Sequence, residues 1–482
     1  MEDAKINKTL LNFRGYGLLK SEFDYKTLNN LRHELTVSPK NLSSFNNNAN
    51  NPSYSIYQES EKRLYIPKNL GLQRFGVPDK DKLKEGLDIN LKFNGKLREN
   101  QVKPVEAYLK AAKDDTMRGG LINLPCGFGK TSISLYIISK LQKKTLVIVH
   151  KDFLLKQWRE RIEQFLPDAR IGLVKAKVID IEDKDIVVGS LQSLSMKEYD
   201  KGTFDEFGFM IADECHHLSS EVFSRALQKI NCRYSLGLSA TMTRKDGLSK
   251  VFKWHLGDIV YKNTKKKVDN VDILCYEYYV EDDKYSKEEL LFNGRPNMAR
   301  MINNICEYEP RMDKIVSIIK KLKENEVKRN IIILSDRRNH LKELKNKLDS
   351  KNIGNVGYYV GGMKDEELKK SEEKCDILLG TFSMASEGMD IPKLDTLILA
   401  SPKSDIVQSV GRILRKKPED RLYTPLIIDI NDMFSMFINQ SKKREKYYNK
   451  CKYNITKVQN EKIKTIQEDL NKFNQGKCLI QN

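Results

Sequence analysis

The sequence predicts an α/β fold with two tandem lobes, each built on a parallel β-sheet, plus a small N-terminal domain and a helical C-terminal tail. Short apolar runs alternate with helical patterns from Leu97 to about Tyr261, and the same alternation returns after about residue 309. Strands that alternate with helices imply right-handed βαβ units, and therefore parallel sheets. A chain of 482 residues is long enough for two to three domains, each with its own core.

The expected strands are apolar runs bounded by polar or turn residues. The expected strands of the first lobe are residues 145–150, 185–190 and 208–213, and those of the second are residues 330–335, 376–382, 396–401 and 426–430. Another such run, residues 271–280, falls between the lobes. The expected domains are an N-terminal accessory domain (1–90), the first lobe (91–262), an interlobe connection (263–308), the second lobe (309–435) and a basic helical tail (436–482).

In two of these segments, the sequence pattern gives little indication of the structure. Residues 1–90 mix short amphipathic runs with the Asn-rich stretch Asn46 to Asn51, which is expected to be a loop or an insertion. The tail interleaves basic and aromatic residues, including Lys442-Lys443-Arg444 and Tyr447-Tyr448, a pattern that can grip a nucleic-acid backbone. The plainer interpretation, which we favour, is a helix packed through Ile455 and Val458 with its charges solvated.

A Gly-rich segment, Leu-Pro-Cys-Gly-Phe-Gly-Lys-Thr, separates an apolar strand-like run from a helical run. Such a turn lets backbone N–H groups converge on phosphate oxygens, and the helix that follows adds its positive N-terminal end. The strict pattern has Gly at position 124, where this chain has Leu, but the Gly-x-Gly-Lys-Thr core is intact. Lys130 is expected to reach the β- and γ-phosphates, and the Thr131 hydroxyl to ligate Mg²⁺. The expected phosphate-binding residues are Leu124, Pro125, Cys126, Gly127, Phe128, Gly129, Lys130 and Thr131.

Two acids end the apolar run Phe209 to Ala212, about 80 residues downstream. Paired carboxylates at the carboxyl end of a strand lie where a parallel sheet places its ligand chemistry. Asp213 is expected to hold the same Mg²⁺ as Thr131, and Glu214 to orient and deprotonate a water. Beside the phosphate loop, this pair predicts a nucleoside triphosphatase.

With these motifs in place, the chain resembles a superfamily 2 helicase of the DExH kind, with RecA-like lobes. The segment Leu97 to Gln101 resembles the adenine-reading motif, which implies nucleotide contacts from Arg98 and Gln101. Asp213-Glu214-Cys215-His216 resembles motif II, with Cys where Ala is commoner. Ser239-Ala240-Thr241 resembles motif III, and the resemblance implies that His216, Ser239 and Thr241 couple hydrolysis to movement. His216 has a second interpretation, as a packed neighbour of the acids.

Two further motifs carry the resemblance into the second lobe. Residues 380–390 resemble motif V, which contacts nucleic acid through Thr381 and nucleotide through Gly388 and Asp390. Residues 408–415, Gln-Ser-Val-Gly-Arg-Ile-Leu-Arg, match motif VI. The resemblance implies catalytic roles for Gln408, Arg412 and Arg415, the arginines acting on the γ-phosphate of ATP in a cleft between the lobes. Because the arginines lie three residues apart, one helix face is expected to present both.

A closer resemblance is to the XPB/UvsW-like branch and to the transcription helicases of large cytoplasmic DNA viruses, such as poxviruses, African swine fever virus and giant viruses. It rests on the Cys-Gly-Phe-Gly-Lys-Thr loop, the pair Gln157-Trp158, and Arg244-Lys245-Asp246 after motif III. XPB-like proteins have Glu at the middle position of that last loop, which is implicated in duplex opening, and Lys245 reverses its charge. The strand contacts that the resemblance implies are His150, Lys151, Ser190, Arg244 and Thr381.

Composition is consistent with a polyanion partner. The formal net charge is +19, although an AT-rich coding genome would also enrich Lys. Eight scattered Cys, with no Cys-x-x-Cys, are typical of reduced thiols in an intracellular protein and predict no zinc site. The sequence contains no signal peptide and no stretch of 18 apolar residues, so we expect a soluble protein that is not secreted and has no membrane partner. A viral protein of this kind would lie in the host cytoplasm or the virion.

The expected function is that of an ATP-dependent, Mg²⁺-requiring DNA helicase or translocase, a monomeric motor in viral transcription or repair, with the transcription machinery as a candidate partner. An RNA helicase is the first alternative, because both nucleic acids present similar backbones. Arg244-Lys245-Asp246 and Gln157-Trp158 favour DNA. A scaffold with a decayed ATPase is the second alternative, but Lys130, Glu214 and both arginines are present. A restriction-type motor is weaker still, since neither terminal region has a nuclease constellation.

Overall fold

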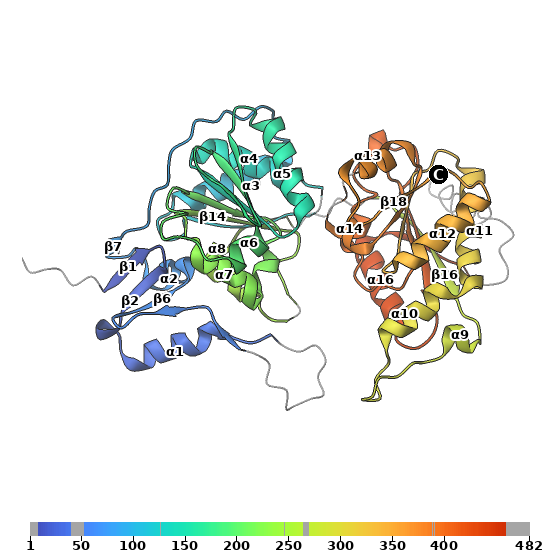
Figure 1. Ribbon diagram of the computed structural model, residues 1–482, viewed down its shortest axis with the longest axis horizontal. Coiled ribbons are helices and arrows are strands. Elements are labelled where there is room, and N and C mark those ends of the chain that lie inside the picture. The colour runs from blue at the N-terminus through green and yellow to red at the C-terminus, as the bar shows by residue number, and fades with distance from the viewer. Residues whose placement is uncertain are drawn as a thin grey trace, which may run out of the picture. The chain divides into compact units, whose positions relative to one another are not determined.

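The computed structural model describes residues 8–39, 53–125, 127–244, 246–263, 269–387, 389 and 391–458. The chain divides into two compact units, Met1–Thr264 and Lys265–Asn482. Each unit has its own large sheet with helices packed on it (Figure 1). The expected α/β class with parallel sheets is confirmed.

The main sheet of the first unit has eight strands in the order β11-β10-β12-β9-β13-β14-β8-β15. Every neighbouring pair is parallel except β10 and β11. The strands are β8 (Gly119–Asn123), β9 (Thr145–Val149), β10 (Ile171–Lys175), β11 (Val178–Asp180), β12 (Ile186–Ser190), β13 (Phe209–Ala212), β14 (Tyr234–Ser239) and β15 (Ile259–Lys262). Three of them lie within the strands expected from sequence.

Helices cover both faces of this sheet, because alternate side chains of each strand enter two different cores. In β9, Val147 and Val149 pack with one set of helices, whereas Leu146 and Ile148 pack with the other. Strands buried on both faces read as unbroken apolar runs, which is why they could be recognised in the sequence. The first set is α3 (Glu99–Lys113), α4 (Lys130–Leu141) and α5 (Asp152–Phe165); the second is α6 (Leu191–Met196), α7 (Glu221–Lys229) and α8 (Ser249–Leu256).

The N-terminal residues form a second, five-stranded sheet in the order β5-β6-β2-β1-β7. Its core includes Leu248, which precedes α8, and Val251 and Trp254 of α8. The buried ammonium group of Lys68 donates to the carbonyls of Cys232 and Arg233, at 2.6 and 3.0 Å. The N-terminal sheet is therefore anchored on the main lobe. Its elements are β1 (Thr9–Asn12), β2 (Gly15–Leu19), α1 (Tyr25–Leu35), β3 (Thr36–Val37), β4 (Tyr54–Ser55), β5 (Gln58–Glu59), β6 (Arg63–Ile66), α2 (Lys68–Phe75) and β7 (Lys80–Asp81), with β3 and β4 paired apart from the sheet.

The second unit has seven strands in the order β18-β19-β17-β20-β21-β16-β22, and all neighbours are parallel. They are β16 (Asp272–Tyr278), β17 (Ile331–Leu334), β18 (Val356–Tyr359), β19 (Ile377–Gly380), β20 (Thr396–Leu399), β21 (Leu426–Asp432) and β22 (Asn454–Val458). β16 lies in the segment expected to connect the lobes, and β22 in the expected tail. The second sheet thus recruits a strand from each side of residues 309–435.

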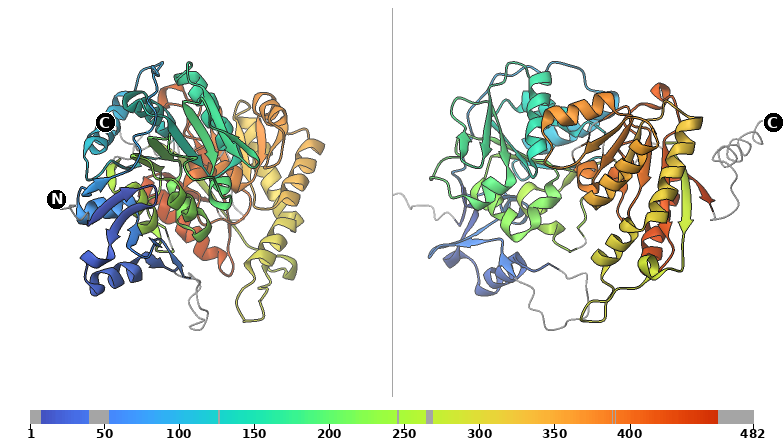
Figure 2. Two further views of the ribbon diagram at one scale, coloured as in Figure 1. Left: turned by 60° about the vertical axis from the view of Figure 1, so that its left-hand side comes forward. Right: turned by 45° about the vertical axis from the view of Figure 1, so that its right-hand side comes forward.

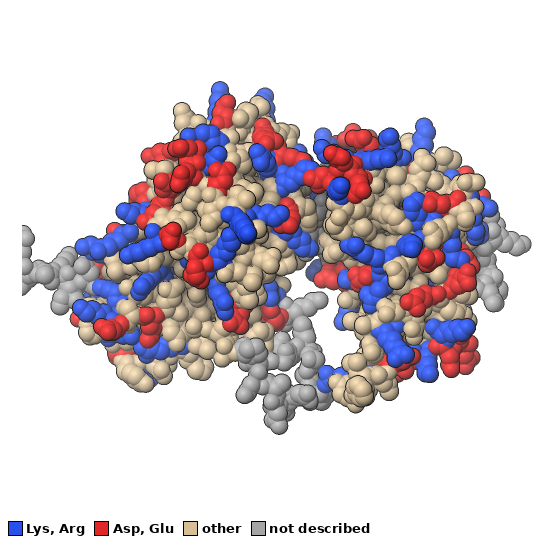
Figure 3. All heavy atoms as spheres, viewed as in Figure 1, with Lys and Arg blue, Asp and Glu red and all other residues tan. Residues whose placement is uncertain are grey.

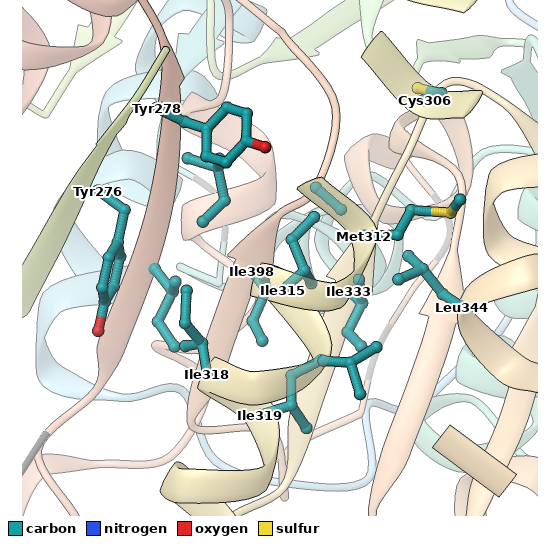
Figure 4. Close-up of a cluster of buried hydrophobic side chains, with 14 of the residues drawn as sticks. Tyr276, Tyr278, Cys306, Met312, Ile315, Ile318, Ile319, Ile333, Leu344 and Ile398 are labelled. Atoms are coloured by element: carbon teal, nitrogen blue, oxygen red, sulfur yellow. The ribbon is translucent and has the colours of Figure 1, made fainter. Parts of the chain in front are cut away.

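Helices also cover both faces of the second sheet (Figure 2). Figure 4 shows one of the two cores, in which Ile315, Ile318 and Ile319 of α11 pack with Ile333 of β17 and Ile398 of β20. The helices are α9 (Asp283–Ser286), α10 (Met298–Glu307), α11 (Glu309–Asn325), α12 (Arg338–Ser350), α13 (Asp365–Lys374), α14 (Phe382–Glu387), α15 (Val407–Val410) and α16 (Phe437–Cys451).

The tail differs from the expected helix in its second half. Ile455 and Val458, expected on the helix, lie in β22, which pairs with β16. Within α16, Arg444 is buried and bonds both carboxylate oxygens of Asp429. Two of the side chains offered for gripping nucleic acid, those of Arg444 and Tyr448, therefore hold α16 to the sheet. Residues 459–482 lie outside the described residues.

Membrane-spanning helices were sought in the part of the chain that the structure describes. No helix there combines the length and the apolar character needed to cross a membrane.

Candidate active site

Most residues predicted for chemistry in the first lobe follow parallel strands at one edge of the sheet. The phosphate loop follows β8, and its Leu124 N–H donates to the carbonyl of Ser239 at the end of β14. Asp213 and Glu214 follow β13, which lies between β9 and β14. The carboxyl edge of an open parallel sheet is where ligands bind, and five strands here contribute to it. The predicted residues that end or follow these strands are Leu124, Pro125, Gly127 to Thr131, His150, Lys151, Ser190, Asp213, Glu214, Ser239 and Thr241.

The phosphate loop needs glycine at its two described Gly positions. Gly127 and Gly129 have left-handed backbone angles, with φ of 77° and 90°. A Cβ on Gly129 would lie 2.3 Å from the Gln101 amide nitrogen and 2.6 Å from an Arg98 guanidinium nitrogen. The loop turns directly into α4, whose first residue is Lys130. Backbone N–H groups and a helix N-terminus therefore meet at this loop, as anion binding requires.

The two residues predicted to read adenine lie against this loop. Gln101 donates to the carbonyl of Phe128 at 2.9 Å and to the Ser132 hydroxyl at 3.2 Å. Arg98 donates to the same Phe128 carbonyl at 2.7 Å. Both side chains thus brace the loop from the N-terminal end of α3. Cys126 lies outside the described residues.

An ion pair joins the loop to the acids. The Lys130 ammonium nitrogen lies 2.5 Å from Glu214 Oε1, and both side chains are largely buried, at 12% and 14% exposed. Glu214 has a left-handed backbone, with φ of 46°, a strained conformation of the kind that clusters at functional sites. Trp158 of α5 donates its indole N–H to Asp213 Oδ2 at 2.9 Å. The structure therefore brings Lys130, Asp213 and Glu214 together.

Burial and charge act differently on the two carboxyl groups. For Asp213, burial is the main cause and raises its pKa, although the nearby Lys130 opposes the shift. For Glu214, burial also favours the neutral acid, but the charge and hydrogen bond of Lys130 outweigh it and lower the pKa. Glu214 is therefore held as a carboxylate by the same lysine that is expected to bind phosphate.

The three predicted coupling residues form one hydrogen-bonded group with Glu214. His216 Nδ1 lies 2.9 Å from Ser239 Oγ, and that hydroxyl donates to Glu214 Oε2 at 3.2 Å. The Thr241 N–H donates to the same Ser239 oxygen at 3.1 Å. Burial lowers the pKa of His216, so the imidazole is neutral near pH 7. A neutral ring can exchange donor and acceptor roles with Ser239.

The residues of the first lobe that were predicted to contact the nucleic-acid strand make different contacts within the protein. Arg244, expected to contact nucleic acid, turns inward: its guanidinium bonds the carbonyl of His216 and both oxygens of Asp246. The His150 ring stacks on His217, with centroids 4.0 Å apart. Lys151 and Ser190 are the residues that precede α5 and α6. Lys245 lies outside the described residues.

In the second unit, Thr381 follows β19, and its hydroxyl lies 3.2 Å from that of Ser383. The expectation that both arginines share a helix face is wrong, because α15 ends at Val410 and turn residues follow. Arg412 is buried and donates to the carbonyls of Ala385 and Met389, at 2.5 and 2.7 Å. Gln408 lies in α15, and Arg415 follows the turn. Gly388 and Asp390 lie outside the described residues.

Two polar contacts of the site were missed from sequence. From sequence, Trp158 entered through the resemblance carried by the Gln157-Trp158 pair, with no contact assigned to its indole, yet it bonds Asp213. Ser132, which bonds Gln101, lies one position beyond the motif. A buried indole N–H needs a partner, so the Trp in the first helix after β9 was the available signal.

The residues present fit a Mg²⁺-bound triphosphate. Asp213 and Thr131 offer the oxygen ligands that Mg²⁺ prefers, and Lys130 offers positive charge for phosphate. The structural observation in favour is the Lys130–Glu214 ion pair, which places the lysine of the glycine loop beside the acids. A bound Mg²⁺ would neutralise phosphate charge in this site.

Comparison with known families gives two matches. Residues 94–244 match the family described as "Type III restriction enzyme, res subunit", and residues 311–417 match the "Helicase conserved C-terminal domain". In fold, the chain is similar to S. cerevisiae Dbp5 bound to RNA and ADP BeF3. That likeness has a TM-score of 0.53 and 13% identity, and covers 79% of this chain and 97% of Dbp5. It shows the fold of two RecA-like lobes.

Curated relatives extend the match over most of the chain. The "Putative ATP-dependent RNA helicase" of Acanthamoeba polyphaga mimivirus is 35% identical over 459 residues, which cover 93% of this chain and 87% of the relative. The "DNA 3'-5' translocase XPB2" of Sulfurisphaera tokodaii is 27% identical over 369 residues, covering 69% and 81%. The chain therefore belongs to the superfamily 2 helicases, as an ATP-dependent nucleic-acid helicase of the branch that includes viral and XPB-like members.

Proposed function

We propose that ATP is hydrolysed at the carboxyl edge of the first sheet, with Lys130, Asp213 and Glu214 at the reacting phosphate. The observation that carries this proposal is the Lys130–Glu214 ion pair beside the glycine loop. Thr131 and Asp213 would hold Mg²⁺. Leu124, Pro125, Gly127, Phe128 and Gly129 would supply the loop backbone, while Arg98 and Gln101 would bind the base.

The ion pair suggests how Glu214 becomes a base. When Lys130 turns to a phosphate oxygen, Glu214 loses the partner that lowers its pKa. The carboxylate is then free to accept a proton from water, while Ser239 continues to donate to its second oxygen. His216 and Thr241 hold that serine, so a change at Glu214 can reach the segment after β14.

We further propose that Arg412 and Arg415, with Gln408, supply positive charge to the transferring phosphoryl group from the second unit. The support is the match to motif VI, because charge developing on phosphate is stabilised by fixed guanidinium groups. Arg412 already donates to two carbonyls, so its guanidinium is held in a fixed orientation. Gly388 and Asp390 of motif V are proposed nucleotide contacts by resemblance alone.

For the nucleic acid, we propose duplex DNA as the preferred track, with phosphate contacts from His150, Lys151, Ser190 and Thr381. Phosphate contacts carry no base identity, which suits a motor. On the face drawn in Figure 3, Lys and Arg are interspersed with Asp and Glu, so the net charge of +19 is not gathered in one patch there. We therefore expect that a few local phosphate contacts, and not a broad basic surface, position the nucleic-acid strand. Arg244 is proposed to act indirectly, by holding His216.

RNA is the second candidate, because the mimivirus relative is named an RNA helicase, whereas the Sulfurisphaera relative is named a DNA translocase. ATP turnover should be measured in parallel with duplex DNA, single-stranded DNA and RNA, using Glu214→Gln as the inactive control. We expect duplex DNA to stimulate turnover at least as well as RNA. Stimulation by RNA alone would overturn the DNA proposal and leave the ATPase proposal intact.

We also propose that the chain acts in viral transcription or repair, as a monomer that works with transcription proteins; the viral source of the mimivirus relative supports the viral part of this proposal. Sedimentation of the chain with and without DNA tests the monomer proposal. A dimer at working concentration would contradict it.

A further inference from the structure

Trp158 is the residue of the site that the ATPase chemistry does not yet use. Its side chain is 1% exposed and packs in a core with Leu154 and Ile162 of the same helix. The indole N–H is its one polar group, and it donates to Asp213 Oδ2 at 2.9 Å. A buried N–H that bonds a carboxylate is a charge-assisted contact, stronger than one between neutral groups.

The Asp213 carboxylate is fixed from two sides. Oδ2 accepts the Trp158 N–H, and Oδ1 accepts the backbone N–H of Glu214 at 3.0 Å. The backbone of Asp213 is itself tied to β9, through a bond from its N–H to the Ile148 carbonyl. Donors on both oxygens set the rotation of the carboxylate and leave the remaining lone pairs for a cation. Groups that orient a metal ligand in this way commonly tune metal affinity.

The helix that carries Trp158 begins beside the proposed strand contacts. β9 ends at Val149, His150 and Lys151 follow, and α5 begins at Asp152. Trp158 lies in the second turn of that helix, six residues from its start. A helix is a rigid element, so a displacement at its first turn moves the indole as well.

We propose that Trp158 is a positioning residue: its indole N–H orients Asp213 for Mg²⁺, and α5 connects that carboxylate to the strand contacts at His150 and Lys151. This inference rests on the proposed function, in which Asp213 is a Mg²⁺ ligand. It assigns to the Trp of the Gln157-Trp158 pair a role that packing alone does not explain.

The first test uses the chain's two tryptophans, Trp158 and Trp254. Labelling with 5-fluorotryptophan gives one fluorine signal from each, and Trp158→Phe assigns them. Trp254 lies on α8 in the N-terminal core, away from the Asp213 contact. We expect the Trp158 signal to shift on adding Mg²⁺–ADP and again on adding DNA, with a smaller change at Trp254. A Trp158 fluorine signal that shifts with neither addition would contradict the proposal.

The second test removes only the N–H. Replacing Trp158 with benzothienylalanine keeps the ring shape and substitutes sulfur for the donor, and Trp158→Phe is the simpler variant. We expect the Mg²⁺ concentration for half-maximal binding of a non-hydrolysable ATP analogue to rise about tenfold. Trp254→Phe is the matched control for loss of a buried indole and should leave that concentration unchanged.

Asp213→Asn separates the two levels of the proposal. If this variant binds the Mg²⁺–nucleotide normally, Asp213 is not a metal ligand and the proposed function fails. If Asp213→Asn loses Mg²⁺-dependent binding while the benzothienyl protein keeps the wild-type Mg²⁺ requirement, the positioning role is overturned and the proposed function stands.

Discussion

In the first unit, polar and charged side chains at the carboxyl edge of the sheet bond to one another, whereas in the second unit buried charges bond the helices to the sheet. Lys130 pairs with Glu214 and Trp158 with Asp213, each pair joining separate elements next to the phosphate loop. In the second unit, Arg311 of α11 makes a bidentate pair with Asp432 at the end of β21. Arg444 of α16 donates from Nε to both carboxylate oxygens of Asp429 in β21.

This difference separates chemistry from stability. In the proposed mechanism, the network of the first unit surrounds groups that change partners during hydrolysis, so we expect that it can be altered without unfolding the unit. The pairs of the second unit are fully buried and hold the shape of the unit. Both tryptophans lie in the first unit, so tryptophan fluorescence follows the unfolding of that unit, while circular dichroism follows both.

The largest expected effect is on turnover in the first unit. Glu214→Gln removes the proposed base, and Lys130→Ala removes the cation at the phosphate, so each should lower ATP turnover by about a thousandfold. Nucleic-acid binding should be retained. Glu221→Gln on α7, where the acid pairs with Arg225 at the surface, is the matched control and should be as active as the wild type. Residual turnover within tenfold of the wild type would remove Glu214 from the chemistry.

In the second unit, the largest expected effect is on stability. Arg311→Leu strands a buried carboxylate at Asp432 and should lower the free energy of unfolding by about 3–5 kcal/mol. Urea unfolding should show the loss by circular dichroism but not by tryptophan fluorescence. Adding Asp432→Leu should restore much of the stability, because neither charge then remains buried. An equal loss in the fluorescence transition would mean that the two units unfold as one.

Acid should weaken each unit through its own histidine. Burial is the main cause that lowers the pKa of His255 in the first unit and His340 in the second, each to about 3. Between pH 6.5 and 3 the unfolded chain binds the extra proton, so stability falls as the pH drops below 6.5, by up to about 1.4 kcal/mol per pH unit for each histidine. His340→Gln should reduce the slope of unfolding free energy against pH for the second unit between pH 6.5 and 5.5. The corresponding slope for the first unit should not change. Equal flattening in both units would be the contrary result.

The smallest expected effect concerns strand binding. Lys151→Gln in the first unit should weaken DNA binding for every sequence and reduce the salt slope by about one, since one phosphate contact loses its charge. Thr381→Val in the second unit should weaken binding with the salt slope unchanged, because its hydroxyl carries no charge. Equal salt slopes for the two variants would argue that Lys151 does not contact phosphate.

The sequence was most informative where a strand is buried on both faces. β17 is four consecutive apolar residues, Ile331–Leu334, all buried, and the flanking polar residues marked its ends. The phosphate loop was recognisable because Gly127 and Gly129 need left-handed backbone angles before a helix. These features depend on local sequence, so they could be predicted.

Features that depend on residues distant in the sequence could not be predicted. The run at 272–278 has the same apolar character as other strands, but only pairing with β21 and β22 places it in the second sheet. One signal was present but was not used: Gly411 follows Val410, the last residue of α15, and glycine often marks the end of a helix, so Arg412 lies beyond it. The inward turn of Arg244 depends on the His216 carbonyl, 28 residues away.

The most direct test of the central idea is the rate of ATP hydrolysis by Arg415→Ala in the presence of duplex DNA. The proposed division of labour predicts that kcat falls about a thousandfold, because an arginine of the second unit no longer stabilises charge on the phosphate held by the first. ATP affinity should stay within a few-fold of the wild type, and circular dichroism should show an intact second unit. Undiminished turnover in a folded variant would contradict the account.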